Sequence, residues 1–218
     1  MIISSESIEN FIDARYEKLE LFVTTLLKWN EKINLVAKAT EEEIWNRHIL
    51  DSAQLLKFIP DTKAKIVDLG SGAGFPGLVL AIMGYENVTL IESDNKKSVF
   101  LQEAARITGT KVQIINERIE NVAPLLTSPR KQGEEAIFDV VTARALSDLT
   151  SLLNLAEPFL GENSQCLFLK GKKLKEELEV SKKFWQVTET IYESIVVPED
   201  ASDRGFVLQL NKVSKING

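Results

Sequence analysis

The sequence predicts an α/β protein whose sheet is mostly parallel, with a C-terminal antiparallel hairpin and a helical N-terminal extension. Apolar residues recur at helical spacing up to about residue 59. From residue 64 onward, short apolar runs alternate with helical patterns, and two β-rich runs close the chain with no helix between them. Strands that alternate with helices form a parallel sheet covered on both faces. We therefore expect residues 1–60 to pack as an extension on one compact domain, residues 61–218.

Size and composition are typical of a globular protein. The chain has 218 residues, 44% of them hydrophobic and 27% charged, which is enough to bury a substantial core. No apolar run approaches the length that spans a membrane, and the N-terminal residues lack a signal core. We expect a cytoplasmic monomer with no membrane partner.

Charge and side-chain chemistry narrow the function classes. A formal net charge of −6 argues against a general nucleic-acid-coating protein, although a local basic face can still hold a polyanion. The single cysteine, Cys166, lies in an apolar run and predicts a buried thiol rather than a nucleophile. No cluster of His, Cys and acidic residues in the sequence suggests a metal site.

The predicted elements follow in order along the chain. An apolar stripe at helical spacing runs from Ile8 to Leu27, breaks at residues 29–35 and resumes from Glu41 to Phe58, where Pro60 ends it. Strands are expected at residues 64–68, 87–92, 111–116, 138–143 and 164–169, with helices at 77–83, 95–108, 148–157 and 173–185. The final β-rich runs, 186–197 and 205–212, should form a hairpin at the sheet edge. Residues 124–135 predict a surface loop.

Residues 66–77, IVDLGSGAGFPG, form the most informative motif. An apolar strand meets an acid and then four glycines within eight residues, followed by an apolar helical run with Pro76 in its first turn. Glycines at such a bend let the backbone approach a ligand closely, because a Cβ would occupy the space that the ligand needs. We expect this turn to hold a nucleotide-like cofactor at the carboxyl end of the first strand.

Two cofactor classes fit the glycine turn. The spacing Gly-x-Gly-x-x-Gly over residues 72–77, with Glu92 downstream, satisfies the dinucleotide fingerprint. The spacing Asp-x-Gly-x-Gly-x-Gly over residues 68–74 resembles motif I of class I S-adenosylmethionine-dependent methyltransferases, whose acid and glycines surround the methionine part of the cofactor. An acid suits an ammonium or sulfonium better than a pyrophosphate. The terminal hairpin also favours the methyltransferase sheet, because a dehydrogenase would continue with a second mononucleotide half.

Ligands in such sheets bind outside the carboxyl ends of the strands, which selects the candidate cofactor residues. Gly70, Gly72 and Gly74 follow the first strand. Glu92 ends the second, where its carboxylate can accept hydrogen bonds from ribose hydroxyls. Capping of the next helix is the alternative role for Glu92, but Asp94 can supply that cap.

The later strand ends add candidates for the adenine and the substrate. Ile119 offers an apolar face and Glu120 an acceptor for the adenine amine, although a solvated helix start also fits this segment. Arg144 follows the fourth strand, where it faces both cofactor and substrate and can bind phosphate or a guanine edge. A cationic cluster follows the fifth strand: Lys170, Lys172 and Lys173.

Missing motifs narrow the reaction. Enzymes that methylate exocyclic amines of nucleic acids carry Asn/Asp-Pro-Pro-aromatic after the fourth strand, where this chain has Ala143-Arg144-Ala145. Methylation of a pyrimidine carbon needs a thiolate, and Cys166 lies mid-strand without the usual preceding proline. An acceptor with a free lone pair remains. Guanine N7 is such a group, for which alignment suffices and no general base is required.

Five segments in order resemble the bacterial 16S rRNA (guanine-N7)-methyltransferase family, also called glucose-inhibited division protein B: residues 34–35, 47–52, 68–77, 143–145 and 169–171. The hexad Arg-His-Ile-Leu-Asp-Ser at 47–52 and Phe-Pro-Gly at 75–77 discriminate best. The resemblance implies S-adenosylmethionine as cofactor, and 16S rRNA or the small ribosomal subunit as partner, with one guanine of the decoding region as substrate. It also implies cofactor contacts by Gly70, Phe75, Ile119, Glu120 and Arg144, with Glu92 as the ribose partner.

The hexad and the cations supply the candidate catalytic and substrate-binding residues. We expect Arg144 and Lys170 to act in catalysis, and the substrate to be bound by Arg47, His48, Lys170, Lys172 and Lys173. On a helix Arg47 and Asp51 lie four residues apart and can pair. A packed, hydrogen-bonded helix residue is the alternative role for His48.

Other functions stay open from the residues alone. A methyltransferase acting on another RNA, a small molecule or a protein would need the glycine turn but not the cations. A nucleotide-binding oxidoreductase would need a second domain. A non-catalytic RNA-binding module would have no use for the glycine turn.

Overall fold

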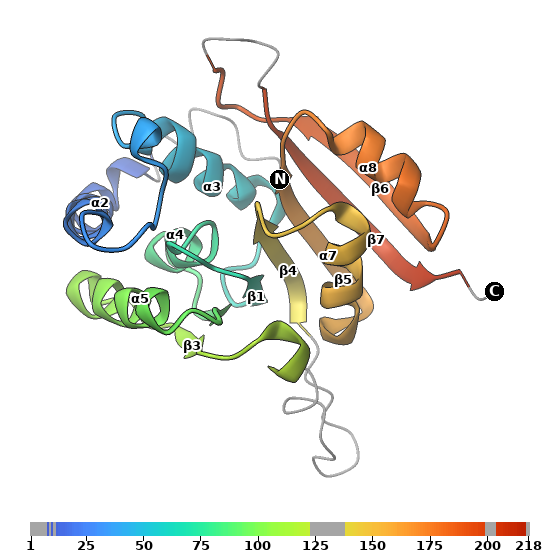
Figure 1. Ribbon diagram of the computed structural model, residues 1–218, viewed down its shortest axis with the longest axis horizontal. Coiled ribbons are helices and arrows are strands. Elements are labelled where there is room, and N and C mark those ends of the chain that lie inside the picture. The colour runs from blue at the N-terminus through green and yellow to red at the C-terminus, as the bar shows by residue number, and fades with distance from the viewer. Residues whose placement is uncertain (1–7, 9, 11, 123–137, 199–203, 217–218) are drawn as a thin grey trace.

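The computed structural model describes residues 8, 10, 12–122, 138–198 and 204–216, and in this part of the chain seven strands form one sheet (Figure 1). Their spatial order is β3 (Gln113–Ile115), β2 (Asn87–Ile91), β1 (Lys65–Leu69), β4 (Phe138–Arg144), β5 (Leu160–Lys170), β7 (Phe206–Lys215) and β6 (Trp185–Glu193). The strand pairs among β1 to β5 are parallel, whereas β7 runs antiparallel to both β5 and β6. The predicted α/β fold with a C-terminal antiparallel hairpin is confirmed.

The hairpin joins the sheet through its second strand. β7 pairs with β5 and leaves β6 at the edge. Burial explains why β7 and not β6 takes the inner position. Leu208 and Leu210 of β7 are fully buried, whereas Trp185 is the one buried residue within β6. A mostly apolar strand buries more apolar surface in an interior position. A strand in which apolar and polar residues alternate tolerates the edge.

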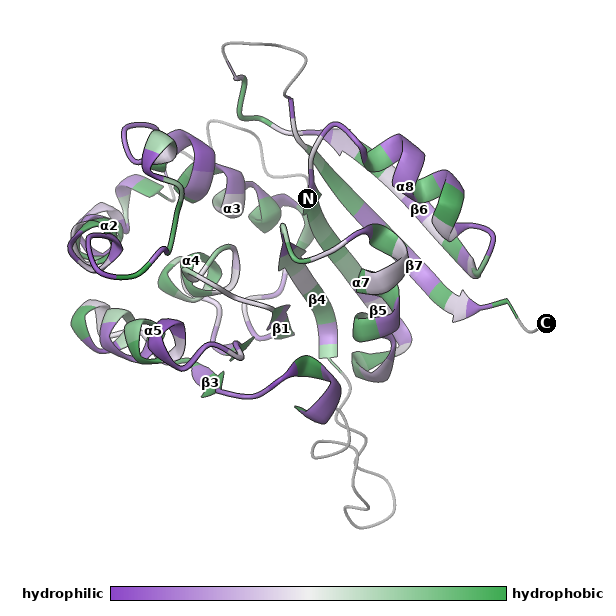
Figure 2. Cartoon of the chain, viewed as in Figure 1, coloured by the Kyte–Doolittle hydropathy of each residue, from purple (hydrophilic) through white to green (hydrophobic). Residues whose placement is uncertain are grey.

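Helices cover both faces of the sheet. In Figure 1, α2 (Tyr16–Asn30), α3 (Asp51–Ala53), α4 (Gly77–Ile82) and α5 (Asn95–Thr108) lie on one side of the strands, and α7 (Leu149–Ala156) and α8 (Leu174–Ser181) lie on the other. Successive strand residues point to opposite faces, so Ile66 belongs to the core under α4 and Val67 to the core under α7. Figure 2 shows the resulting hydrophobic colour concentrated along the central strands.

Helix α2 packs on α4 and α5, which cover one face of the sheet. Leu19, Phe22 and Leu26 of α2 are fully buried, and α2 packs against α5. The Phe22 ring centre lies 5.5 Å from that of Phe75 and 6.3 Å from that of Phe100. Helix α2 is therefore in contact with Phe75 of the glycine turn. The division of the chain into two units at residue 60 stays a prediction.

The break after α2 is held by one side chain. The Asn30 carbonyl oxygen accepts hydrogen bonds from the backbone N–H groups of Leu35 (2.8 Å) and Val36 (3.0 Å). Its amide donates to the Val36 carbonyl at 3.1 Å. An asparagine that satisfies backbone groups in this way offers the chain an alternative to continuing the helix. It brings Leu35 back toward the sheet.

The second helical stretch is less regular than predicted. It contains a π-helical segment over Trp45–Leu50, then α3, then a 3-10 segment over Gln54–Phe58. π-Helical turns are wider than α-helical turns and occur often at functional sites. The hexad at residues 47–52 spans this irregular segment, so its side chains do not follow ordinary α-helical spacing.

Some element boundaries differ from the predictions. The helix expected to reach residue 185 ends at Ser181, because Trp185 is buried at the start of β6. β5 begins at Leu160 instead of 164, and β3 spans three residues, Gln113–Ile115. The predicted loop at 124–135 lies outside the described residues.

Two predictions from composition can be compared with the structure. Cys166 is fully buried, as expected, and burial raises the pKa of its thiol. Among the described helices, none has both the length and the apolar character needed to cross a bilayer.

Candidate active site

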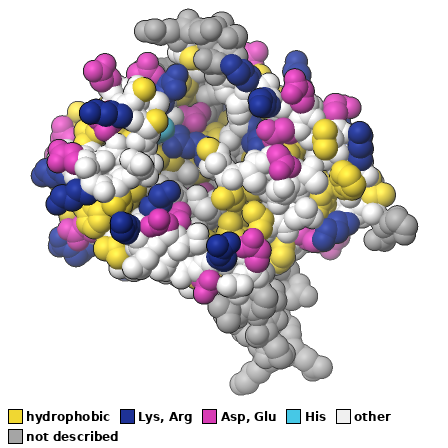
Figure 3. Space-filling model, viewed as in Figure 1, with side chains coloured by type: hydrophobic (Ala, Val, Ile, Leu, Met, Phe, Trp, Pro, Cys, Tyr) yellow, Lys and Arg dark blue, Asp and Glu magenta, His cyan; other side chains and the backbone are white. Residues whose placement is uncertain are grey.

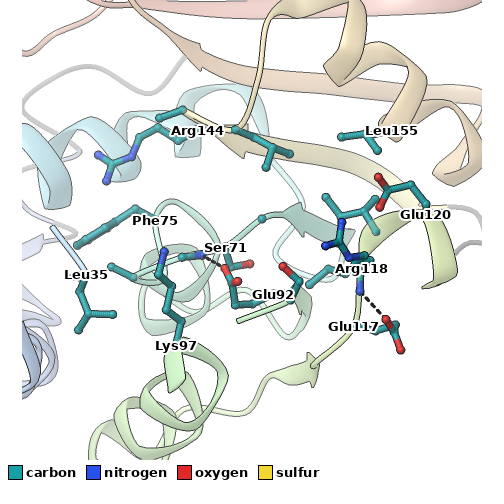
Figure 4. Close-up of a pocket in the computed structure, with 18 residues that line it drawn as sticks. Leu35, Ser71, Phe75, Glu92, Lys97, Glu117, Arg118, Glu120, Arg144 and Leu155 are labelled. Carbon is teal, nitrogen blue, oxygen red and sulfur yellow. Dashed lines mark hydrogen bonds between the residues drawn. The ribbon is translucent and has the colours of Figure 1, made fainter. Parts of the chain in front are cut away.

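A cavity of about 460 Å³ opens at the carboxyl ends of β1, β2 and β4, where the sheet topology predicts a ligand site (Figure 4). It is lined by most of the predicted cofactor residues: Gly70, Gly72, Phe75, Glu92, Ile119, Glu120 and Arg144. Gly74 is absent from this lining. It adopts a φ of +91°, and a Cβ there would lie 2.9 Å from Leu78 Cβ, so its lack of a side chain serves the packing of the turn on α4.

The other glycines leave room on the cavity side of the turn. Gly70 has a φ of +66°, and a Cβ there would lie 2.6 Å from Leu146 Cδ1. Gly72 has a φ of +55°, and a Cβ there would meet nothing closer than the Gly70 carbonyl oxygen at 3.8 Å. Positive φ is accessible to glycine at little cost. Gly72 thus exposes its backbone directly to the cavity.

Glu92 joins the glycine turn to the end of β2. Its buried carboxylate accepts the Gly72 N–H at 2.8 Å on Oε2 and the Asp94 N–H at 2.7 Å on Oε1. A carboxylate oxygen has two lone pairs, so each can accept one further bond from a ligand. Asp94 caps α5 itself, through hydrogen bonds from the N–H groups of Lys96 and Lys97. The helix start therefore does not require Glu92.

Glu120 lies at the opposite end of the cavity from Phe75 and Arg144 (Figure 4), and its neighbour in the chain, Ile119, also lines the cavity. Ile119 is buried and Glu120 is exposed. The residues that sequence reasoning did not assign to this lining include Leu35, Lys97, Arg118, Leu146 and Leu155. Leu155 comes from the last turn of α7, and no local pattern signals which apolar residue of this helix lines the cavity.

Arg144 ends β4 at the junction of three segments. Its guanidinium lies 4.7 Å from the centre of the Phe75 ring, and Nη1 donates to the Arg47 carbonyl at 3.1 Å. The same nitrogen lies 3.8 Å from Asp51 Oδ2. The next residue, Ala145, has a φ of +51°, which is rare for a residue with a Cβ. The chain thus bends sharply where the cavity wall begins.

The predicted ion pair between Arg47 and Asp51 is wrong. Arg47 pairs with Glu43 at 2.5 Å, on the exposed surface, and Asp51 faces Arg144 instead. In the π-helical turn at residues 45–50 a full turn takes more residues, so Asp51 no longer lies on the face of Arg47. Burial raises the pKa of Asp51, and the nearby Arg144 opposes that rise.

A second cavity, of about 950 Å³, adjoins the first. Arg144, Ala145 and Leu146 line both cavities. All the predicted substrate-binding residues line the second one: Arg47, His48, Lys170, Lys172 and Lys173. Figure 3 shows basic and acidic side chains around a hollow beside the histidine. In the described part of the chain, no group of three or more His, Cys or acidic side chains is arranged to hold a metal ion.

Two of these side chains are more tightly held than the sequence suggests. Lys170 Nζ lies 2.6 Å from Glu177 Oε2 and donates to the Ser147 carbonyl at 2.9 Å. His48 stacks on the Phe75 ring at 5.0 Å, and its Nε2 lies 3.1 Å from Thr40 Oγ1. Burial, followed by the charges of Arg144 and Arg47, lowers the pKa of His48 to about 3. The imidazole is therefore neutral at physiological pH.

The acid of the glycine motif lies beneath the cavity. Asp68 is fully buried and is absent from the cavity lining; its Oδ1 accepts a hydrogen bond from Thr142 Oγ1 at 2.8 Å. A Cβ on Gly77 would lie 2.6 Å from Asp68 Cβ, so this glycine lets α4 approach β1. Burial raises the pKa of Asp68 to about 6, against hydrogen bonds and the charge of Arg144.

Comparison with known families decides between the candidate classes. The family described as "GidB: rRNA small subunit methyltransferase G" matches residues 15–206. The chain belongs to this family. Membership confirms the fold, the methyltransferase class and the S-adenosylmethionine cofactor that the sequence predicts. It excludes the alternative that the chain is a nucleotide-binding oxidoreductase.

Members of the rRNA small subunit methyltransferase G family align along nearly the whole chain. The protein of that name from Paramagnetospirillum magneticum is 48% identical over 199 residues, which cover 91% of this chain and 89% of the relative. The one from Gluconobacter oxydans is 45% identical over 201 residues, covering 92% and 95%. Among solved structures, M. jannaschii TYW2 in complex with AdoMet has a TM-score of 0.58 at 17% identity, covering 85% of this chain and 80% of that one. This structural likeness supports the fold.

Proposed function

We propose that this chain transfers the methyl group of S-adenosylmethionine to N7 of a guanine in the decoding region of 16S rRNA. The observation that carries the proposal is the wall shared by the two cavities. A donor in the first and a base in the second would meet at Arg144, Ala145 and Leu146. The cations of the second cavity suit a polyanion, although the whole chain is acidic.

The first cavity fits the cofactor in its hydrogen-bonding groups and in its shape. Gly70 and Gly72 leave space that a Cβ would narrow, and Gly72 faces open space. Glu92 keeps lone pairs for the ribose hydroxyls, and Ile119 with Glu120 offers an apolar face and an acceptor to the adenine. Bound there, the cofactor supplies a sulfonium-bound methyl carbon open to in-line attack.

The protein side chains position the acceptor. Guanine N7 carries a free lone pair and no proton, so none of these residues has to act as a base. The Arg144 guanidinium, fixed by the Arg47 carbonyl and the Phe75 ring, can donate to O6 beside N7. Lys170 places a positive charge near the phosphates. We assign Arg144 and Lys170 to the reaction on this basis.

The remaining predicted substrate residues bind the RNA in this proposal. Arg47, Lys172 and Lys173 contact phosphates, because exposed cations steer and hold nucleic acid without reading its sequence. The neutral His48 supports Phe75 and contacts the base by packing. We further propose that the protein acts as a cytoplasmic monomer, with residues 1–60 as an extension that completes the site of residues 61–218.

Mapping the modified nucleotide tests the proposal. Purified protein, S-adenosylmethionine and small ribosomal subunits from cells that lack the gene should yield 7-methylguanine at one position of the decoding region, detected by base-specific cleavage of the RNA. Large subunits serve as the control substrate and should stay unmodified. Methylation of another RNA, or none on either subunit, would favour the alternative of another RNA or a small molecule.

A further inference from the structure

Asp51 occupies a position that the proposed reaction does not yet use. Its side chain is 19% exposed and lines the second cavity but not the first. Its Oδ2 lies 3.8 Å from Arg144 Nη1, at the wall that both cavities share. A hydrogen-bond donor, Arg144, and a hydrogen-bond acceptor, Asp51, thus lie side by side where the base would enter.

The two oxygens of this carboxylate have different surroundings. Oδ1 accepts hydrogen bonds from Gln54 Nε2 at 2.7 Å and from Ser194 Oγ at 3.1 Å. Gln54 is itself buried, and its side-chain oxygen accepts a hydrogen bond from the Ile195 N–H. The Gln54 amide is therefore held at both its oxygen and its nitrogen. Both hydrogen bonds that the described residues donate to the Asp51 carboxylate go to Oδ1. No side chain in the described part of the chain donates a hydrogen bond to Oδ2, so its lone pairs can accept from a ligand.

The other carboxylates of this cavity are engaged elsewhere: Glu43 with Arg47, Glu177 with Lys170, and Asp148 with Ser151 at the start of α7. Among the described acidic residues of the cavity, Asp51 is the one that faces Arg144. Because Asp51 accepts hydrogen bonds and Arg144 donates them, the pair matches a ligand that carries hydrogen-bond donors next to an acceptor.

Guanine has that pattern over two adjacent edges that meet at O6. N7 and O6 accept hydrogen bonds, and the adjacent N1–H and 2-amino group donate. When N7 faces the methyl donor and O6 faces Arg144, the N1–H and 2-amino groups follow O6 around the base, on the side of Asp51. Adenine presents a donor in place of O6 and an acceptor in place of N1–H, so both contacts would be repulsive.

We propose that Asp51 is a specificity-determining residue that accepts hydrogen bonds from N1–H and the 2-amino group of the target guanine. Arg144 contacts O6 on the same edge. The inference rests on the proposed function, because it requires a guanine in the second cavity. Gln54 and Ser194 act as positioning residues that hold Oδ1 and so aim Oδ2 at the base.

A substitution in the base tests this contact without disturbing the protein. Small subunits are reconstituted with 16S rRNA that carries guanine or hypoxanthine at the target position. Hypoxanthine lacks the 2-amino group and keeps N7, O6 and N1–H. The ratio of kcat/KM for the two substrates is measured for wild type, for Asp51→Asn and for the matched control Glu43→Gln. Each ratio compares two substrates of one protein, so losses of stability cancel.

Wild type and Glu43→Gln should discriminate against hypoxanthine by about tenfold, which corresponds to one lost contact to a base. In Asp51→Asn the side-chain oxygen stays with the Gln54 donor and the amide NH2 faces the base, so this variant should discriminate by less than about threefold. Asp51→Ala should behave in the same way. Binding of S-adenosylhomocysteine by both variants, measured by calorimetry, shows that they are folded.

Equal rates on guanine and hypoxanthine with wild type would overturn the inference and leave the proposed function standing. Full discrimination by Asp51→Asn and Asp51→Ala would do the same. Absence of 7-methylguanine from the guanine substrate would overturn the proposed function, and this inference with it.

Discussion

The Arg144 guanidinium lies 4.7 Å from the centre of the Phe75 ring, and this contact joins the glycine turn to the end of β4. The same ring is stacked by His48 at 5.0 Å, so the hexad also meets the turn at this point. A cation over an aromatic face is attracted by the ring quadrupole. Phe75, which lines the first cavity, therefore contacts two residues that line the second.

Gly72→Asp should abolish cofactor binding while the fold persists. The position has a φ of +55° and open space where a Cβ would lie, and aspartate tolerates this conformation better than most residues. The new carboxylate would enter the cavity beside Glu92 and repel it. We expect affinity for S-adenosylhomocysteine, measured by calorimetry, to fall by about 100-fold or more.

Gly109→Asp is the matched control for that variant. Gly109 has a φ of +60°, nothing lies within 4 Å of a Cβ there, and it caps the far end of α5. The backbone strain is similar, but the cavity is untouched. Undiminished affinity in Gly72→Asp, or an equal loss in Gly109→Asp, would show that the turn does not hold the cofactor.

Arg144→Ala should depress methyl transfer more than stability. The variant loses a forked donor in the wall between the cavities, so we expect kcat/KM on the small subunit to fall by about 10- to 100-fold. Arg144→Lys keeps the charge but not the fork and should recover little of the loss. Arg106→Ala removes an exposed arginine paired with Glu103 and should retain wild-type transfer. Full activity in Arg144→Ala would remove this residue from the mechanism.

Lys173→Gln should weaken RNA binding uniformly and lower its salt dependence. Lys173 is exposed at the start of α8 and lines the second cavity. Loss of one phosphate contact should reduce the slope of log K against log salt by about one. Lys182→Gln is the control, because Lys182 pairs with Glu189 at 2.6 Å on β6. An unchanged slope in Lys173→Gln would place the RNA backbone elsewhere.

Asp68 should make stability fall as the pH rises. Its pKa is raised to about 6 in the folded protein from an ordinary value of 3.8, chiefly by burial. The folded state therefore holds the proton more tightly than the unfolded state. The stabilisation is complete below pH 3.8 and is lost as the pH rises through about 6, a change of about 3 kcal/mol in the free energy of unfolding.

Urea denaturation at several pH values measures this effect. Asp68→Asn cannot ionise and should not show the loss between pH 4 and 7 that wild type shows. Asp61→Asn, which removes an exposed carboxyl group of the same type, should follow wild type. Coincident pH profiles of Asp68→Asn and wild type would contradict the prediction.

Local patterns were enough for much of the fold and for most of the residues that line the first cavity. The apolar runs at β1, β2 and β4, the glycine turn and the terminal hairpin each have a signature in neighbouring residues. The position of Glu92 in the cavity lining could be predicted from its place at a strand end, because parallel strands bring their carboxyl ends to one edge. Boundaries were less accurate at β5 and α8, where tertiary pairing and the burial of Trp185 decide the ends.

By itself, the sequence determined the α/β class, the glycine turn and the set of cations near the strand ends, because these depend on residues close together in the chain. Tertiary structure alone decided which charges meet. Arg47 turned to Glu43, and Asp51 turned to Arg144, which lies 93 positions away in the chain. The physical reason is that ion pairing in a partly buried site depends on distance in space and on desolvation, and the π-helical turn at residues 45–50 carries Asp51 off the face of Arg47.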